Sequence, residues 1–366
     1  MTASQITKSG ITIRVAAVLF IALLPGGIQA QISNPAGGLT EIAPEKIWPQ
    51  TLHGSHYNEF WNYHIYLDDG TKVHITYSAA NFGSLKSPVS GVRVSVLFPG
   101  RNGHELFQVS REYAIDYLVL DEQNGRFQLR AERELFFEGK LPETHRIRIF
   151  TRKDGNQFDI DFTFSNISRG YTRGNGKFDV NGEQIGHLTH IPFAEVKGHA
   201  AVNDMRREAT GTAYMDHTYQ FQTTTSLLKS GYRFVYLKDA DNWDSIFFLL
   251  PEDGREMKTV GYRLYKRNGV VRQAAIERIT QITKRRVSGK NIALTMEIEL
   301  DNGERLRITR SEDEETFSVL GELGWIARRA ARTFLGGEII DFRGTAHLLE
   351  DSQLPKIGEY NFFIVD

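Results

Sequence analysis

Side chains that could transfer protons concentrate in one stretch of the sequence, between residues 187 and 220. Four of the eleven histidines lie there: His187, His190, His199 and His217. In an extended strand through the segment GTAYMDHTYQ, residues 211–220, Tyr214 and Asp216 share one face. Desolvation raises the pKa of a carboxyl group in an apolar interior, so Asp216 is a candidate proton donor with Tyr214 beside it. The alternative is structural, with Asp216 capping a turn or pairing with an arginine in the wall of the fold.

Other chemistries have less support. The four histidines lack the spacing of an HExxH site, and we expect neither a bound metal nor a cofactor. No serine sits in a G-x-S-x-G turn, which argues against a hydrolase triad. Because the chain has no cysteine, disulfide scaffolds, thiolate metal sites and cysteine nucleophiles are excluded.

The composition is that of an ordinary globular protein. The 366 residues suffice for about two domains. With 44 Lys and Arg against 45 Asp and Glu, the net charge is −1, which provides no basic surface for a nucleic acid and no polybasic membrane anchor. The 23 Phe, 14 Tyr and 33 Gly against only 10 Pro favour strands and turns over a helical bundle.

Apolar and polar residues alternate from Trp61 onward, in short runs typical of half-buried strands. The runs WNYHIYL and TKVHITYS flank Asp69-Gly70 and predict a hairpin, and residues 154–156 and 302–303 mark two further turns. Within residues 157–165, QFDIDFTFS, three phenylalanines share one parity and two aspartates the other. We therefore predict an all-β chain of antiparallel strands.

One stretch has a helical pattern. Residues 323–334 show this pattern, and Gly336-Gly337 follow as a stop signal. We therefore expect one short helix there, near the C-terminus. A short sequence pattern occurs twice in the chain, as Gly211-Thr-Ala-Tyr and as Gly344-Thr-Ala-His, and each copy closes a series of predicted strands. We refer to this repeat as the sequence echo. This spacing predicts two copies of one β architecture, although three small residues can also agree by chance. About 150 residues per copy fits an eight-stranded barrel, so we expect barrels over residues 31–220 and 221–366.

Residues 1–30 have the pattern of a signal peptide. The basic residues Lys8 and Arg14 come before the apolar run VAAVLFIALL, residues 15–24. Small residues follow it, up to a predicted cleavage site after Ala30. Ten apolar residues are too few to cross a membrane, which takes about 20. We therefore predict a soluble periplasmic or secreted protein whose mature chain has no transmembrane segment. The alternative is an uncleaved N-terminal anchor.

The stretch around Asp216 resembles the AttH and carotenoid 1,2-hydratase (hydroxyneurosporene synthase) family. Residues 211–217 are similar to the family's G-x-A-Y/W-x-D-H element, and residues 344–347 resemble its closing G-x-A strand. The resemblance implies two lipocalin-like, or calycin, barrels in tandem. Two elements depart from the family: Thr189-His190 replaces an aromatic-Ser pair, and Tyr219-Gln220 replaces Trp-Gly.

The resemblance also implies roles for particular residues. In the carotenoid hydratases a Tyr-x-Asp pair and an upstream histidine are associated with protonation of an isoprenoid double bond. The matching positions are Tyr214, Asp216 and His187, which we expect to be catalytic if the chain is an enzyme. The ligand-binding candidates are the neighbouring residues His190, His217 and Tyr219.

Three functions remain open on these grounds. We expect first a protein that binds or carries a hydrophobic small molecule, such as a lipid or isoprenoid, because an antiparallel barrel can hold one apolar ligand. The alternative is an acid-catalysed hydratase, isomerase or cyclase that acts on an isoprenoid-like substrate with Asp216 as proton donor. A third possibility is an export or adhesion module without a ligand.

Overall fold

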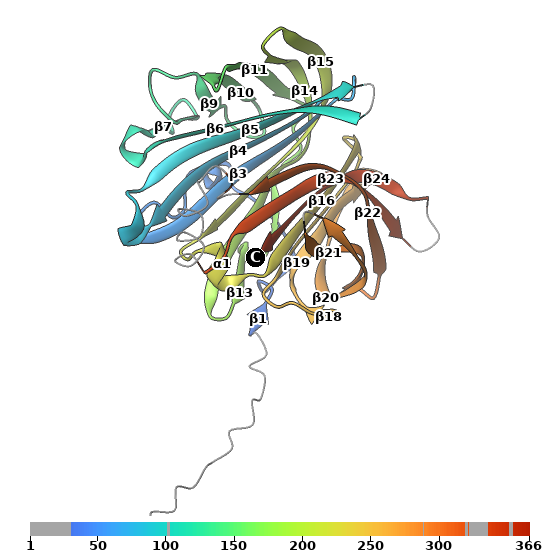
Figure 1. The fold of residues 1–366 in the computed structure, drawn as a ribbon. Coiled ribbons are helices and arrows are strands. Elements are labelled where there is room, and N and C mark those ends of the chain that lie inside the picture. The colour runs from blue at the N-terminus through green and yellow to red at the C-terminus, as the bar shows by residue number, and fades with distance from the viewer. Residues whose placement is uncertain (1–30, 101–102, 288, 319–320, 322–335, 351–353) are drawn as a thin grey trace, which may run out of the picture.

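The computed structural model describes residues 31–366 apart from 101–102, 288, 319–320, 322–335 and 351–353. Most of the described residues lie in antiparallel strands, which form two sheets. Figure 1 shows the N-terminal sheet, in blue to olive green, packed against a C-terminal barrel coloured yellow to red. The chain passes from one sheet to the other between Gln220 and Ser230.

The N-terminal sheet is the larger of the two. Its strands are β1 (Ile32–Ser33), β2 (Leu39–Glu41), β3 (His56–Leu67), β4 (Lys72–Phe82), β5 (Val89–Gly100), β6 (Gly103–Ala114), β7 (Val119–Asp121), β8 (Arg126–Gln128), β9 (Leu135–Glu138), β10 (His145–Lys153), β11 (Asn156–Ser165), β12 (Tyr171–Arg173), β13 (Lys177–Val180), β14 (Glu183–Val202) and β15 (Met205–Gln220). The main order is β6-β5-β4-β3-β15-β14-β11-β10-β9-β8-β7. Three 3-10 helices interrupt it: η1 (Pro44–Ile47), η2 (Gly83–Leu85) and η3 (Ile115–Tyr117). The long hairpin of β14 and β15 therefore lies in the middle of the sheet.

The C-terminal sheet closes into a barrel. Its strands are β16 (Ser230–Asp239), β17 (Asn242–Leu250), β18 (Glu256–Lys258), β19 (Val260–Arg267), β20 (Val270–Val287), β21 (Lys290–Leu300), β22 (Arg305–Ser318), β23 (Ile339–Glu350) and β24 (Lys356–Val365). Eight of them, all except β18, form a ring that the pairing of β20 with β21 closes. The short helix α1 (Thr224–Leu227) precedes the first of these strands.

The expected hairpins and burial pattern explain how the sheets form. Tyr66 pairs with Lys72 across Asp69-Gly70, and Lys153 pairs with Asn156 at the next predicted turn. The three phenylalanines of β11 lie in the core, whereas Asp159 and Asp161 on its other face form ion pairs with arginines of β10. Each sheet thus encloses its own cluster of buried apolar side chains.

The sequence echo has a physical cause. A Cβ atom at Gly211 would lie 2.2 Å from the carbonyl oxygen of Tyr66, and one at Gly344 would lie 2.0 Å from that of Glu312. Both distances are far below a normal contact, so any other residue would push the neighbouring strand away. The two glycines mark equivalent close approaches of strands in the two sheets.

The predicted all-β fold class is confirmed: of the two expected barrels, the C-terminal one is a closed eight-stranded antiparallel barrel, and the N-terminal unit is a second large antiparallel sheet. The helix expected at residues 323–334 and the signal peptide expected at residues 1–30 both lie outside the described residues. Within the described part of the chain, no helix is both long and apolar enough to span a membrane.

Candidate functional site

Asp216 lies where the two sheets meet. It occupies the middle of β15, paired with Thr189 of β14 on one side and Asn62 of β3 on the other. Ala213 and Met215 point into the core of the N-terminal sheet, whereas Tyr214 and Asp216 point toward the barrel, as the strand parity predicts. We call this contact between the outer faces of the two sheets the seam.

Every oxygen of the Asp216 carboxylate has a partner. Arg233 of β16 donates from Nη2 to Oδ1 at 2.9 Å and from Nε to Oδ2. Asn62 donates to Oδ1 at 3.0 Å, and the Tyr214 hydroxyl donates to Oδ2 at 3.0 Å. Burial alone would raise the pKa of Asp216, but the charge of Arg233 and these hydrogen bonds hold it well below its usual range. Asp216 is therefore an ionised member of a buried ion pair.

His187 extends this network across the seam. Its Nε2 lies 3.4 Å from Oδ2 of Asp216, and its Nδ1 lies 2.8 Å from the hydroxyl of Tyr262 on β19. The imidazole is stacked on Phe247 of β17, with ring centroids 3.6 Å apart. Burial lowers the pKa of His187, so the ring is neutral near pH 7. The structure thus brings together the three predicted catalytic residues, Tyr214, Asp216 and His187.

The three predicted ligand-binding residues lie on the other side of the sheet. His217 is fully buried, with Nε2 2.6 Å from Oε1 of Glu59 and its ring stacked on Trp61. His190 lies near it, with ring centroids 5.6 Å apart. Tyr219 packs in a small apolar cluster with Ile42 and Leu188. These side chains pack inside the N-terminal sheet and do not join the group around Asp216.

A second buried anion sits further along the seam. Glu315 of β22 is 2% exposed and accepts hydrogen bonds from several donors of the N-terminal sheet. Ser95 Oγ and Gln108 Nε2 lie 2.6 and 2.7 Å from Oε1, and Arg93 pairs with the same oxygen. Burial opposes ionisation, but Arg343, His74 and Arg93 hold the pKa of Glu315 well below its usual range. Ion pairs and hydrogen bonds therefore connect the sheets at more than one level.

A pocket of about 200 Å³ opens at the end of the seam. Two cross-strand pairs line its opposite walls: Thr212 with Tyr66 from the N-terminal sheet, and Val235 with Glu359 from the barrel. Thr71 and Lys72, the latter paired with Tyr66, add further polar groups to the lining. Thr212, which lines this pocket, comes two residues before Tyr214 and four before Asp216 in β15. All three side chains therefore lie on the same face of the strand.

Glu359 is the most unusual titratable group in this pocket. Its side chain is 17% exposed, and Oε1 lies 2.8 Å from Nζ of Lys72. Lys72 also contacts both carboxylate oxygens of Glu314 at 2.7 Å, so one ammonium group serves two carboxyl groups. Burial and the charge of Glu314 outweigh Lys72 and raise the pKa of Glu359 to about 7. Near neutral pH, Glu359 is thus divided between its acid and its carboxylate forms.

Three polar atoms of the residues that line this pocket are buried without a hydrogen-bond partner among the described residues: Oε2 of Glu359, the hydroxyl of Tyr66 and Oγ1 of Thr71. A buried polar group without a partner is costly, and such groups are concentrated at functional sites. A carboxyl group with a pKa near 7 beside a pocket can give up a proton and recover it.

Reasoning from the sequence missed Glu359, Tyr66 and Arg233. Glu359 alternates with buried aromatic residues in β24, so its parity indicates an ordinary solvent-facing side. Arg233 offered a better signal, because it interrupts the apolar run of β16 and lies among the six buried residues at the start of that strand. Such a charge in a buried strand demands a partner.

No family model and no curated protein sequence matches this chain. Solved structures do. A protein of Nitrosomonas europaea described as an AttH has a TM-score of 0.61 at 13% identity, over 88% of this chain and 97% of its own. The chain has the fold of AttH-like proteins. Kievitone hydratase from Nectria haematococca matches this AttH-like fold with a TM-score of 0.54 at 14% identity, over 91% of this chain and 97% of its own. CghA matches with a TM-score of 0.54 at 10% identity, over 85% and 89% of the two chains.

Proposed function

We propose that this chain is an enzyme of the hydratase, isomerase or cyclase type that protonates a carbon–carbon double bond in an apolar, isoprenoid-like substrate. The observation that carries the proposal is Glu359, a carboxyl group with a pKa raised to about 7 at the wall of the seam pocket. The hydratase among the structures with the AttH-like fold supports the reaction class. A pocket of about 200 Å³ is smaller than that of a typical whole ligand, so it would hold the reacting end of a longer molecule.

One carboxyl group, that of Glu359, can both donate and recover the proton that this reaction needs. The proton of Glu359 moves to one alkene carbon, and a carbocation develops on the other. The ring of Tyr66, which lines the pocket, would stabilise that charge through its π face. Addition of water yields an alcohol, and loss of a neighbouring proton yields an isomer. In either case one proton returns to the carboxylate of Glu359, and the enzyme is regenerated.

This proposal gives the residues expected from the family a different role. Asp216 is held ionised by Arg233, so the geometry does not support the proton-donor role expected for it. Asp216 instead holds Tyr214 and Arg233 in place beneath the pocket. We propose that Asp216, Tyr214 and His187 are positioning residues that fix the two sheets relative to each other.

The carrier function that we expected first receives less support. Aromatic and aliphatic side chains fill the cores of both sheets. The seam pocket, at about 200 Å³, is too small to enclose a whole lipid, as a carrier would need to do. We therefore place catalysis ahead of transport.

Deuterium incorporation tests the proposal. Purified protein incubated in D₂O with a panel of isoprenoid alkenes should place deuterium on carbon, at a rate that falls above about pH 7 as Glu359 loses its proton. Glu359→Gln keeps the shape of the side chain but has no acidic proton, and it should lower the rate by about 100-fold or more. Mass spectrometry of the products measures both effects.

Two further variants make the assignment specific. Glu314→Gln removes the negative charge that helps raise the pKa of Glu359, so the falling limb of the pH profile should move to lower pH. Glu208→Gln changes a carboxylate that is 72% exposed and should alter nothing. Undiminished turnover in Glu359→Gln would refute the role of Glu359. A bound lipid in organic extracts, without deuterium incorporation, would favour the carrier function instead.

We also propose that the chain is exported and cleaved after Ala30. Support comes from the basic and apolar pattern of residues 1–30. The mass of the protein recovered from the periplasm or medium should correspond to a chain that begins at Gln31. Recovery of exported protein with an intact Met1 would contradict cleavage.

A further inference from the structure

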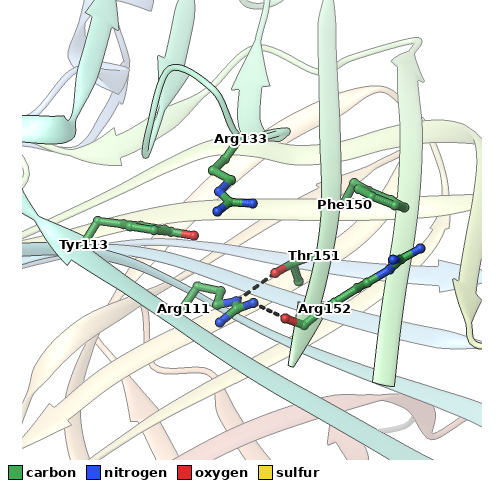
Figure 2. Close-up of a pocket in the computed structure, with 6 residues that line it drawn as sticks. All are labelled: Arg111, Tyr113, Arg133, Phe150, Thr151 and Arg152. Carbon is green, nitrogen blue, oxygen red and sulfur yellow. Dashed lines mark hydrogen bonds between the residues drawn. The ribbon is translucent and has the colours of Figure 1, made fainter. Parts of the chain in front are cut away.

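A second pocket, of about 400 Å³, lies on the N-terminal sheet between β6 and β10. Figure 2 shows its six lining residues: Arg111, Tyr113, Arg133, Phe150, Thr151 and Arg152. None of them belongs to the barrel, and none belongs to the seam pocket. The lining of this pocket is therefore separate from that of the proposed catalytic site.

The charged residues that line this pocket are all positive. Three of the six lining residues are arginines and none is acidic. The arginines around it are neutralised by carboxylates, as shown by Arg130, Arg146 and Arg148. Within the described residues, by contrast, no carboxylate forms an ion pair with the three arginines of the pocket. The lining thus carries positive charge that no ion pair balances: Arg152 donates from Nε to Oε1 of Gln157, and the charge of Arg133 acts on the exposed carboxylate of the neighbouring Glu132 without forming an ion pair.

The arrangement of the side chains favours a ligand between them. Arg111 Nε donates to the Thr151 hydroxyl at 2.8 Å, and its Nη2 donates to the carbonyl oxygen of Arg152, so Arg111 is anchored at the floor. In Figure 2 the guanidinium group of Arg133 extends from the loop between β8 and β9 toward Arg111, and the hydroxyl of Tyr113 points into the same space. The guanidinium group of Arg133 and the hydroxyl of Tyr113 therefore face the same space beside Arg111.

We propose that this pocket binds an organic anion, a ligand whose carboxylate or phosphate group is attached to an aromatic or other apolar body. Guanidinium groups recognise anionic oxygens through charge-assisted hydrogen bonds. The rings of Tyr113 and Phe150 provide the apolar contact for the body of the ligand. A volume of about 400 Å³ falls within the range of small-molecule sites.

Binding of three naphthalene derivatives to the full chain tests this proposal. 1-Naphthyl phosphate and 1-naphthoate should bind, and the neutral 1-naphthalenemethanol should bind at least about tenfold more weakly. Tighter binding of the phosphate would identify a phosphate ester as the natural ligand class, and tighter binding of 1-naphthoate would identify a carboxylate. Higher salt should weaken both anions and leave the alcohol unchanged.

Arg133→Gln tests the contribution of positive charge to binding. The side chain of Arg133 is exposed and forms no ion pair within the described residues, so the substitution should not disturb the fold. The variant should lose about tenfold in affinity for the anions. The matched control is Arg305→Gln, which removes an exposed arginine from the barrel and should bind as the wild type does. The ligand should also protect Arg111 and Arg133 from modification by phenylglyoxal, which requires no variant. Equal affinity for the alcohol, unchanged binding by Arg133→Gln, or no binding at millimolar concentration would overturn the proposal.

Discussion

Replacing Asp216 with asparagine is expected to lower the free energy of unfolding by about 3–5 kcal/mol. The substitution keeps the size of the side chain but removes the charge that balances Arg233, whose side chain is only 9% exposed. A buried guanidinium group then lacks its anion and keeps only neutral acceptors, the amide oxygens of the new asparagine and of Asn361. Urea denaturation followed by fluorescence measures the loss.

Two comparisons separate the ion pair from the substitution itself. Asp204→Asn changes an exposed residue in the turn between β14 and β15 and should leave stability within about 0.5 kcal/mol of the wild type. Adding Arg233→Met to Asp216→Asn removes the unbalanced charge and should recover part of the loss. If Asp216→Asn were as stable as the wild type, the buried pair would not hold the seam together.

Glu359→Gln is expected to remove a pH dependence of stability that the wild type has. The pKa of Glu359 is about 7 in the folded state against an ordinary value of 4.5, so the folded state binds this proton more tightly than the unfolded chain does. Its contribution is fully present below pH 4.5 and is lost as pH rises through 7. A difference of 2.5 pKa units corresponds to about 3 kcal/mol, which the glutamine variant does not lose.

The comparison of the two proteins at two pH values is therefore decisive. The stability of Glu359→Gln relative to the wild type should increase by about 3 kcal/mol between pH 4 and pH 8. Using the difference between proteins cancels the titration of all other groups, including Asp216 and Glu315. Glu208→Gln should show no such trend, since that carboxylate is 72% exposed. Parallel pH profiles of stability for the wild type and Glu359→Gln would mean that folding does not raise the pKa of Glu359.

Local patterns were sufficient to predict the all-β class and its hairpins. Asp69-Gly70 and residues 154–156 form the expected turns, because turn residues and strand alternation act over a few neighbours. The similar environments of Gly211 and Gly344 gave the echo a real structural meaning. The pairing of β15 with β3 was not predictable, since no local signal specifies which distant strands are neighbours.

The candidate site was only half predictable for the same reason. Parity placed Tyr214 and Asp216 on one face, but it could not supply Arg233, which decides whether Asp216 holds a proton. Glu359 is separated from Lys72 by most of the chain, and its pKa depends on that contact and on Glu314. Titration depends on three-dimensional neighbours, whereas sequence patterns report the neighbours along one strand.

The polar character of the seam has a consequence for biogenesis. The N-terminal sheet is complete at Gln220, long before a ribosome has added Glu315 or Glu359. Until then the face that will meet the barrel carries Asn62, Lys72 and Asp216, which water can solvate. The same face also carries Phe178, Val180 and Ile185, apolar side chains that the barrel covers only once it has been made. Exposed apolar surface promotes aggregation of an unfinished chain. The charged and polar part of the join therefore keeps a share of this face compatible with water until the second half is complete.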